Sequence, residues 1–357
     1  MTTVIYWGAK TAYSGVDYDN NSCYIRHMKS ISIIVPFGHC SVTNIEGTHQ
    51  IFNEANSICV AMGKSPLFKV QLVGASDEIS QRDGLFKIKP DILIQDVKKT
   101  DLIIIPAMMG DQQKAIELNQ AFASWLVEQF ANGAEIASFC IGTFFLASTG
   151  LLKGKRCATH WRFANEFRNM FPDSNLVDDK IITEEGGIYT SGGAYSYTNL
   201  VVYLVEKYAG RDVAILIAKA FMIDIDRHSQ SPFIIFQGQK AHEDEPVKKA
   251  QEFIEQNFCE KITVDQLASM FAVGRRNLER RFKKATSNTI VEYIQRVKIE
   301  AAKKSLESSM ENVNEVMYKV GYSDIKAFRT TFKKITGISP MEYKNKYNKK
   351  IALYNEV

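Results

Sequence analysis

Residues 262–293 read ITVDQLASMFAVGRRNLERRFKKATSNTIVEY, and residues 312–343 read NVNEVMYKVGYSDIKAFRTTFKKITGISPMEY. The second segment repeats the pattern of the first at an offset of fifty residues. Such self-similarity at a fixed offset indicates one structural unit that occurs twice. The matching pairs are Leu267 and Met317, Met270 and Val320, Leu278 and Phe328, Phe282 and Phe332, Lys283 and Lys333, Thr286 and Thr336, and Tyr293 and Tyr343.

Each copy predicts two short helices around a turn. In the first copy Leu267 and Met270 share one helical face, and Leu278 and Phe282 are spaced i, i+4 on a following helix. In the second copy Ser323 is placed to cap the second helix. Two helices of about ten residues around a short turn form a helix-turn-helix, in which the first helix holds the second against the major groove of DNA.

The positive charge of the chain is concentrated in this region. Residues 247–350 hold 22 Lys and Arg against 12 Asp and Glu, a net charge of +10, whereas the rest of the chain holds 22 and 28. This distribution predicts a polyanionic partner, double-stranded DNA. The alternative is a solvated helical domain that is rich in lysine.

Arginines crowd the second helix of the first copy, which favours DNA recognition over the alternative. Arginine pairs bidentately with guanine in the major groove, and lysines meet phosphates. The predicted DNA-binding residues are Arg275, Arg276, Asn277, Arg280, Arg281, Ser323, Lys326, Arg329 and Lys333.

The segments QLASMFAVGRRNLERRFKK and VGYSDIKAFRTTFKKITGISPMEY resemble the AraC-type DNA-binding domain. The resemblance covers about a hundred residues and implies a linking helix, here at 290–307, that sets two units on one face of the DNA. The recognition helices are then expected in successive major grooves, about 34 Å apart. The first copy has SNTI at 287–290 where the second has GISP at 337–340, so a different turn after the basic run is expected there.

The length of 357 residues suits two or three domains. No run of eighteen apolar residues occurs, so no membrane partner is expected. Six scattered cysteines without a C-x-x-C pair indicate neither a zinc site nor a disulfide framework, and no cofactor is expected. A reducing cytoplasm fits. The first 27 residues lack the features of a secretory signal; residues 1–29 are predicted to be a disordered extension, with a translation start at Met28 as an alternative.

Strands alternate with helices from Ser30 onward. This rhythm predicts an α/β fold with a flavodoxin-like parallel sheet covered by helices on both faces, ahead of the all-α tandem helix-turn-helix domain. Strands are expected at 31–35, 68–73, 101–105 and 135–139, an edge hairpin at 85–88 and 92–94, and helices at 45–61, 113–130, 196–208 and 213–221.

Cys140 follows the last of these strands at a strand-to-helix turn, ASFCIGT at residues 137–143. A side chain at such a turn lies at the carboxyl edge of the sheet, and a helix N-terminus lowers the pKa of a thiol there. His160 follows twenty residues on. A cysteine with a neighbouring histidine is a candidate nucleophile; the alternative is a buried structural cysteine with a packed histidine.

The stretch ASFCIGTFFLASTGLLKGKRCATHW and GIYTSGG at 187–193 resemble the PfpI branch of the class I glutamine-amidotransferase-like superfamily, over about residues 31–222. The resemblance makes Cys140 the elbow cysteine and His160 its partner. It also implies an acidic residue where this chain has Asn44, and a glycine-rich oxyanion turn where it has AMMG at 107–110. Both departures weaken the case for catalysis. Fused ahead of an AraC-type module, such a domain resembles the GlxA-like regulators, in which it is a sensor and dimerisation domain. The predicted ligand pocket holds Asn44, Met108, Met109, Cys140, Ile141 and His160.

The sequence therefore predicts an α/β sensor and dimerisation domain at 30–223, a linker at 224–246, an AraC-type domain at 247–350 and a tail at 351–357. The expected function is sequence-specific transcriptional regulation by a homodimer that binds an unknown small-molecule effector, with RNA polymerase as a further candidate partner. One alternative is a cysteine-dependent amidase, peptidase or glyoxalase-like enzyme that carries a DNA-binding module. Another gives Cys140 a redox role.

Overall fold

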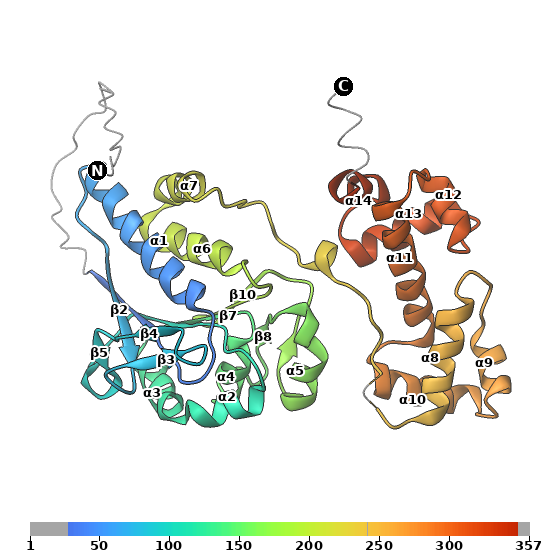
Figure 1. The fold of residues 1–357 in the computed structure, drawn as a ribbon, viewed down its shortest axis with the longest axis horizontal. Coiled ribbons are helices and arrows are strands. Elements are labelled where there is room, and N and C mark those ends of the chain that lie inside the picture. The colour runs from blue at the N-terminus through green and yellow to red at the C-terminus, as the bar shows by residue number, and fades with distance from the viewer. Residues whose placement is uncertain (1–27, 241, 349–357) are drawn as a thin grey trace, which may run out of the picture.

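The computed structural model describes residues 28–240 and 242–348; the predictions for residues 1–27 and for the tail lie outside the described residues. An α/β domain is followed by a purely helical domain, as the sequence predicted (Figure 1). Within the described part of the chain, no helix is long and apolar enough to cross a membrane.

The centre of the first domain is a seven-stranded sheet in the order β10-β11-β7-β6-β1-β2-β5. Its strands are parallel except for β10, which pairs antiparallel with β11 at the edge. The carboxyl ends of the parallel strands therefore share one edge, where sites of such folds form. The strands are β1 (Lys29–Ile34), β2 (Phe68–Gly74), β5 (Ile92–Leu93), β6 (Leu102–Ile105), β7 (Glu135–Phe139), β10 (Ile182–Glu185) and β11 (Ile188–Ser191).

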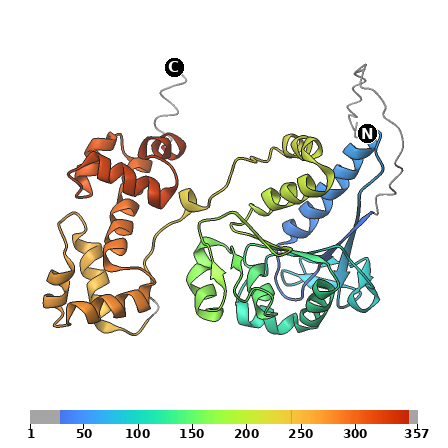
Figure 2. The same ribbon diagram turned by 180° about the vertical axis from the view of Figure 1, so that it is seen from behind.

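Both faces of the sheet are buried, because consecutive residues of a strand point to opposite sides. In β6, Leu102 and Ile104 join one apolar core, and Ile103 and Ile105 join the other. Helices cover both faces (Figures 1 and 2). One side carries α1 (Val42–Ala61), α6 (Tyr197–Ala209) and α7 (Arg211–Ala220), and the other carries α2 (Gln112–Leu118), α3 (Gln120–Ala131), α4 (Gly142–Ser148) and α5 (Ala164–Met170).

Two predictions for this domain are wrong. The predicted hairpin at 85–88 and 92–94 does not form: β4 (Phe86–Ile88) pairs with β3 (Ile79–Gln81), and β5 extends the main sheet beside β2. The predicted helix 113–130 is broken at Asn119, whose side chain accepts a hydrogen bond from the Phe37 amide at 2.8 Å and donates to the Phe37 carbonyl. These contacts hold Asn119 at a φ of −111°, outside helical geometry. The remaining short elements are η1 (Ile94–Asp96), β8 (Arg156–Cys157), η2 (Trp161–Phe163) and β9 (Asn175–Leu176).

The helical domain has two small cores joined by one long helix, α11 (Ile290–Ser308). Its first half packs Tyr293 into one core, and its second half packs Leu306 into the other. Phe282 and Phe332 are fully buried in the respective cores, and burial of such a side chain contributes about 1.5–3 kcal/mol. The other helices are α8 (Glu245–Asn257), α9 (Val264–Met270), α10 (Arg275–Thr286), α12 (Val313–Lys319), α13 (Ile325–Thr336) and α14 (Pro340–Tyr347).

The predicted apolar face that Met270 shares with Leu267 is only partly buried. Leu267 is fully buried, but Met270 is 48% exposed, whereas its repeat partner Val320 is buried. Phe271 and Val273, just beyond the helix end, pack against the core of the first unit instead.

The described residues of the predicted linker, 224–240 and 242–246, lie between the α/β domain and the first helices of the helical domain along the chain (Figure 1). It contains the 3₁₀ turn η3 (Ser231–Phe233).

Candidate functional site

The two helix-turn-helix units have the same local structure at the fifty-residue offset. Thr286 and Thr336 each donate a hydroxyl hydrogen bond to the carbonyl four residues back and to the carbonyl two residues on. Thr289 and Ser339 each cap the next helix in a capping box. The expectation of a different turn in the first copy is wrong, because Ser287 takes the left-handed conformation that Gly337 takes in the second, at φ values of 58° and 79°.

Two arginines of the recognition helix α10 lie on the helix face opposite the core of the first unit. Leu278 and Phe282 are buried. At 100° per residue, Arg276 and Arg280 lie on the opposite face, and both are exposed. Arg280 donates a hydrogen bond to Asn277 at 3.0 Å. This face can enter a major groove with two guanidinium groups at its centre.

The other two arginines of α10 flank the core and bind carboxylates of the same domain. Arg275 forms an ion pair with Asp265 at 3.0 Å. Arg281 donates two hydrogen bonds, of 2.8 and 2.7 Å, to Asp244, which caps α8. The hydrogen bonds from Arg281 hold the pKa of the Asp244 carboxyl below its usual range. Arg281 is thus engaged inside the protein, although the sequence predicted that it binds DNA.

In the second unit α13 is capped by Asp324, whose side chain accepts a hydrogen bond from the Ala327 amide at 2.6 Å. The predicted cap, Ser323, lies one residue too early and is exposed. Exposed residues of α13 include Lys326, Arg329 and Lys333, all predicted to bind DNA. Thr330, which was not among the predicted DNA-binding residues, is aligned with Arg280 by the repeat and is exposed on the outer face.

In the α/β domain Cys140 occupies a strained turn between β7 and α4. Its φ is +55°, and its amide donates to the Ser191 carbonyl at 2.7 Å. A Cβ on Gly142 would lie 2.5 Å from the Pro106 carbonyl oxygen, so only glycine lets α4 start this close to the end of β6. The elbow predicted from the sequence is therefore present, with a non-glycine residue in the left-handed region, which is unusual.

The Cys140 thiol and His160 do not form an activated pair. Burial raises the pKa of the Cys140 thiol to about 12, against a smaller opposing effect of a hydrogen bond from the Ile141 amide. Burial, and to a lesser degree Arg162, lowers the pKa of His160. The Nδ1 atom of His160 accepts a hydrogen bond from the Arg162 amide at 3.1 Å. Within the described part of the chain, no hydrogen bond joins Cys140 to His160.

Asn44 lies at the position that the resemblance assigned to an acid. Its Oδ1 accepts a hydrogen bond from the Ala107 amide at 3.1 Å, and its Nδ2 is buried without a partner within the described residues. Of the two methionines predicted in the pocket, Met108 is buried and Met109 is exposed. Ile141 is buried beside Cys140. The Asn44 side chain therefore accepts the hydrogen bond of the Ala107 amide, which lies in the segment that the resemblance makes an oxyanion turn.

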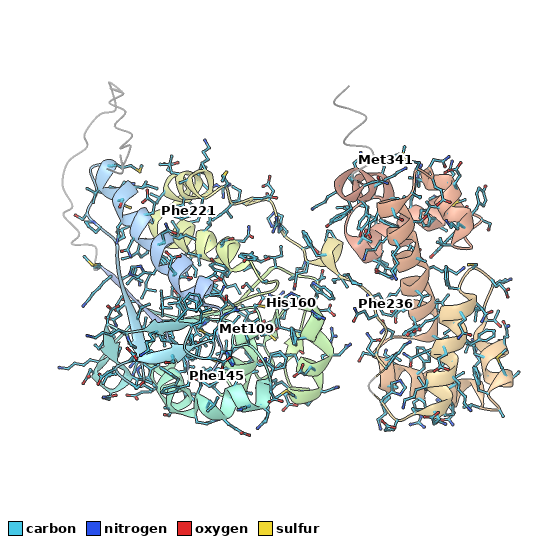
Figure 3. All side chains as sticks on the ribbon, in the orientation of Figure 1. Met109, Phe145, His160, Phe221, Phe236 and Met341 are labelled. Atoms are coloured by element: carbon cyan, nitrogen blue, oxygen red, sulfur yellow. The ribbon has the colours of Figure 1, made fainter. Side chains whose placement is uncertain are left out.

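Two residues near the elbow were not predicted. Thr159 donates a hydrogen bond to the Cys140 carbonyl at 2.9 Å, and the Gln230 side chain donates to the Thr159 carbonyl at 3.0 Å. His160 lies on the side of the α/β domain that faces the helical domain (Figure 3). Gln230 belongs to the predicted linker, and no local pattern marks it, because its partners are up to 71 residues away in the chain. Among the described residues, no group of three or more His, Cys, Asp or Glu could hold a metal ion.

Known proteins match both domains. The DJ-1/PfpI family matches residues 53–207, and a helix-turn-helix domain family matches residues 267–346. The HTH-type transcriptional regulator GbdR of Pseudomonas aeruginosa is 25% identical over 271 residues, which cover 73% of this chain and 70% of that protein. The HTH-type transcriptional regulator ArgR of the same species is 24% identical over 215 residues, which cover 60% of this chain and 65% of that protein.

A solved AraC family transcriptional regulator from Pseudomonas putida matches with a TM-score of 0.47 at 15% identity, over 54% of this chain and 99% of that one. The family matches and the repeated helical units agree on the domain composition. The chain consists of a DJ-1/PfpI domain followed by an AraC-type helix-turn-helix domain.

Proposed function

We propose that this protein is a sequence-specific DNA-binding transcriptional regulator whose α/β domain binds a small molecule and pairs the subunits of a homodimer. The observation that carries the proposal is the repeated unit that exposes Arg276 and Arg280 on one helix and Lys326 on the other. The curated relatives GbdR and ArgR are transcriptional regulators, and the matches, over 271 and 215 residues, are too long to lie within one domain of this chain. The proposal includes a cytoplasmic location, where the protein meets its DNA partner.

Each recognition helix has a distinct role in this proposal. Arg276 and Arg280 read guanine edges in one major groove, with Asn277 oriented by Arg280. In the next groove Lys326, Arg329 and Thr330 face the DNA. Lys333, together with its repeat partner Lys283, contacts phosphates, since both are exposed at the C-terminal end of a recognition helix. The helix α11 sets the spacing of the two units because it contributes to both cores.

The α/β domain acts as a sensor in the proposal. We place the small-molecule site at the carboxyl edge of the sheet, next to Asn44, Cys140 and His160, because ligand sites of such folds form there. Asn44 offers a buried amide donor there, so the ligand presents an acceptor oxygen. Binding regulates only if the ligand has unequal affinity for two arrangements of the protein, one of which suits the DNA.

Catalysis at Cys140 is disfavoured on three grounds. The thiol is protonated at neutral pH, because burial raises its pKa, and the nucleophilic form of cysteine is the thiolate. Asn44 stands in place of an acid. The Ala107 amide belongs to the segment that the resemblance makes an oxyanion turn, and it already donates a hydrogen bond to Asn44. The high thiol pKa also disfavours a redox role, which requires an exposed thiol of low pKa.

The test is binding of the full-length protein to DNA from upstream of its own gene, measured across a salt series with Cys140→Ala and Arg276→Ala variants alongside. The proposal expects sequence-preferring binding that Cys140→Ala retains and Arg276→Ala weakens. Replacement of Lys64, an exposed lysine of the α/β domain, is the matched control for loss of a positive charge. Absence of sequence-preferring binding at low salt would contradict the proposal.

A further inference from the structure

The segment between the two domains is anchored in the α/β domain by one buried side chain, Gln230, which is 2% exposed. Its Nε2 donates to the carbonyls of Lys180 at 2.8 Å, Thr159 at 3.0 Å and Asp178 at 3.3 Å. Its Oε1 accepts from the Trp161 amide at 3.2 Å. One amide side chain thus contacts four backbone groups of the α/β domain, with the two Nε2 hydrogens shared among three carbonyls. The Thr159 carbonyl belongs to a fully buried residue, and a buried carbonyl left without a partner costs free energy.

The α/β domain is shaped to receive this side chain. A Cβ on Gly192 would lie 1.9 Å from Nε2 of Gln230, so glycine is required for the side chain to enter. The backbone beside it is also attached: the Gln230 amide donates to the Asp179 carbonyl at 2.7 Å, and Lys180 and Ser229 form a β-bridge.

Gln230 contacts the backbone on both sides of His160. Thr159 and Trp161 flank His160 in the chain, and each bonds to Gln230. The hydroxyl of Thr159 in turn donates to the Cys140 carbonyl at 2.9 Å. A shift of the backbone at His160 therefore moves two of the four backbone partners of Gln230, those at Thr159 and Trp161. A shift at Cys140 reaches Gln230 through Thr159.

Four residues beyond Gln230 the chain is bound to the helical domain. The Ile234 carbonyl accepts a hydrogen bond from Lys303 of α11, and the Phe236 amide donates to Glu300 of the same helix at 3.1 Å. Phe236 also stacks edge-on against Tyr293 of α11, with ring centroids 5.1 Å apart. We call residues 229–239 the strap, because they bond to both domains without a free stretch between the anchors.

The strap also meets the second helix-turn-helix unit. The Tyr347 hydroxyl donates to the Pro232 carbonyl at 3.4 Å, and the Lys346 ammonium lies 4.9 Å from the centre of the Phe233 ring. The helix α11 sets the two recognition helices relative to each other, since it packs in both cores. Whatever moves the strap therefore moves the element that spaces the DNA-binding units.

We propose that Gln230 is the positioning residue through which the state of the Cys140–His160 elbow sets the placement of the helix-turn-helix domain. The proposal rests on the regulatory function inferred above and adds the route by which the two domains communicate. A ligand that displaces the backbone at His160 withdraws the partners of Gln230, releases the strap and frees the helical domain. Linkage makes the effect reciprocal, so release of the strap also loosens the elbow.

The test compares full-length Gln230→Ala and Gln230→Asn with Gln237→Ala, which removes an exposed side chain from the same strap. Two quantities are measured: the rate of limited tryptic cleavage after Arg227 and Lys240, and the rate of iodoacetamide labelling of Cys140, read by mass spectrometry. The exposed Cys259 of the helical domain serves as the internal reference for labelling.

Both Gln230 variants are expected to raise cleavage after Arg227 and Lys240, on either side of the strap, and Cys140 labelling by about tenfold or more, because each loses side-chain hydrogen bonds to backbone groups of the α/β domain. Labelling of Cys259 and all rates of Gln237→Ala stay at the wild-type level. Gln230→Asn keeps the amide on a shorter side chain and serves if Gln230→Ala does not fold. If cleavage rises while Cys140 labelling stays unchanged, Gln230 only holds the strap to the α/β domain, and the proposed coupling between the elbow and the strap is wrong. Unchanged cleavage would overturn the anchor.

These two rates do not depend on DNA, so they decide the coupling even if the protein fails to bind its upstream DNA and the proposed function falls. Where the wild type binds that DNA, Gln230→Ala is expected to change its affinity at least threefold relative to Gln237→Ala. Equal affinities would show that the strap does not set the placement of the helix-turn-helix domain.

Discussion

Replacement of single arginines of α10 separates the residues that read DNA from those that hold the domain together. Arg276 lies opposite the core and is exposed, whereas Arg281 makes two hydrogen bonds to the capping residue Asp244. We expect Arg276→Ala to weaken specific DNA binding with little change in stability. We expect Arg281→Ala to lower stability with little change in DNA affinity at equal amounts of folded protein.

The magnitudes follow from the two environments. A bidentate arginine–guanine contact contributes about 1–3 kcal/mol of discrimination, which is about 5- to 150-fold in the dissociation constant. Loss of the Arg281 pair leaves the Asp244 carboxylate 23% exposed without its partner, at the start of α8. That change is expected to lower the midpoint of thermal unfolding by a few degrees, since small helical domains shift by about 4–8 °C per kcal/mol.

The assay is fluorescence anisotropy of a labelled upstream DNA fragment, with an unrelated fragment of equal length as the control for non-specific binding. Thermal unfolding by circular dichroism is recorded on the same samples. If Arg281→Ala weakens specific binding as much as Arg276→Ala at equal folded fraction, Arg281 reads DNA and the assignment of the two arginines is wrong. If Arg276→Ala binds both fragments as the wild type does, Arg276 does not read DNA.

Three further predictions test the local structure. Ser287→Gly is expected to raise the free energy of unfolding by up to about 1 kcal/mol and Gly337→Ser to lower it by a similar amount, since both positions are left-handed; urea titrations that give both the same sign would contradict this. Thr289→Ala removes a capping box and is expected to cost about 1 kcal/mol in the same titration. Burial raises the pKa of Cys140 to about 12, so little thiolate is present below that pH. The rate of iodoacetamide labelling of Cys140, measured by mass spectrometry against the exposed Cys259, is therefore expected to keep rising with pH beyond pH 9. A labelling rate that levels off near neutral pH would contradict this.

Much of the fold was predictable because it follows from local periodicity. The strand at 135–139 was predicted with the bounds that the structure has. The helix that the AraC-type resemblance implied at 290–307 begins at Ile290, as expected. The errors occurred where a distant contact overrides local preference. Asn119 breaks a predicted helix because its side chain bonds to the backbone of Phe37, 82 residues away.

The candidate site divides in the same way. Cys140 was recognisable because a strand-to-helix turn leaves a local signature, and the structure places it at that turn. Its left-handed conformation was not predicted. Its protonation was not predictable, because a helix N-terminus suggested a lowered pKa while burial raises it. Likewise the sequence placed four arginines on α10 but did not separate Arg276 and Arg280 from Arg275 and Arg281, whose carboxylate partners lie 10 and 37 residues away.

The sequence by itself determined the repeated helix-turn-helix units, the α/β domain and the clustering of positive charge, because each depends on residue spacing within a short window. Only the tertiary structure decided which arginines bind carboxylates, that the Cys140 thiol is desolvated, and that Gln230 connects the elbow to the segment that leads to the helical domain. These properties depend on hydrogen bonds and burial between residues far apart in the chain, and such contacts leave no periodic pattern in the sequence.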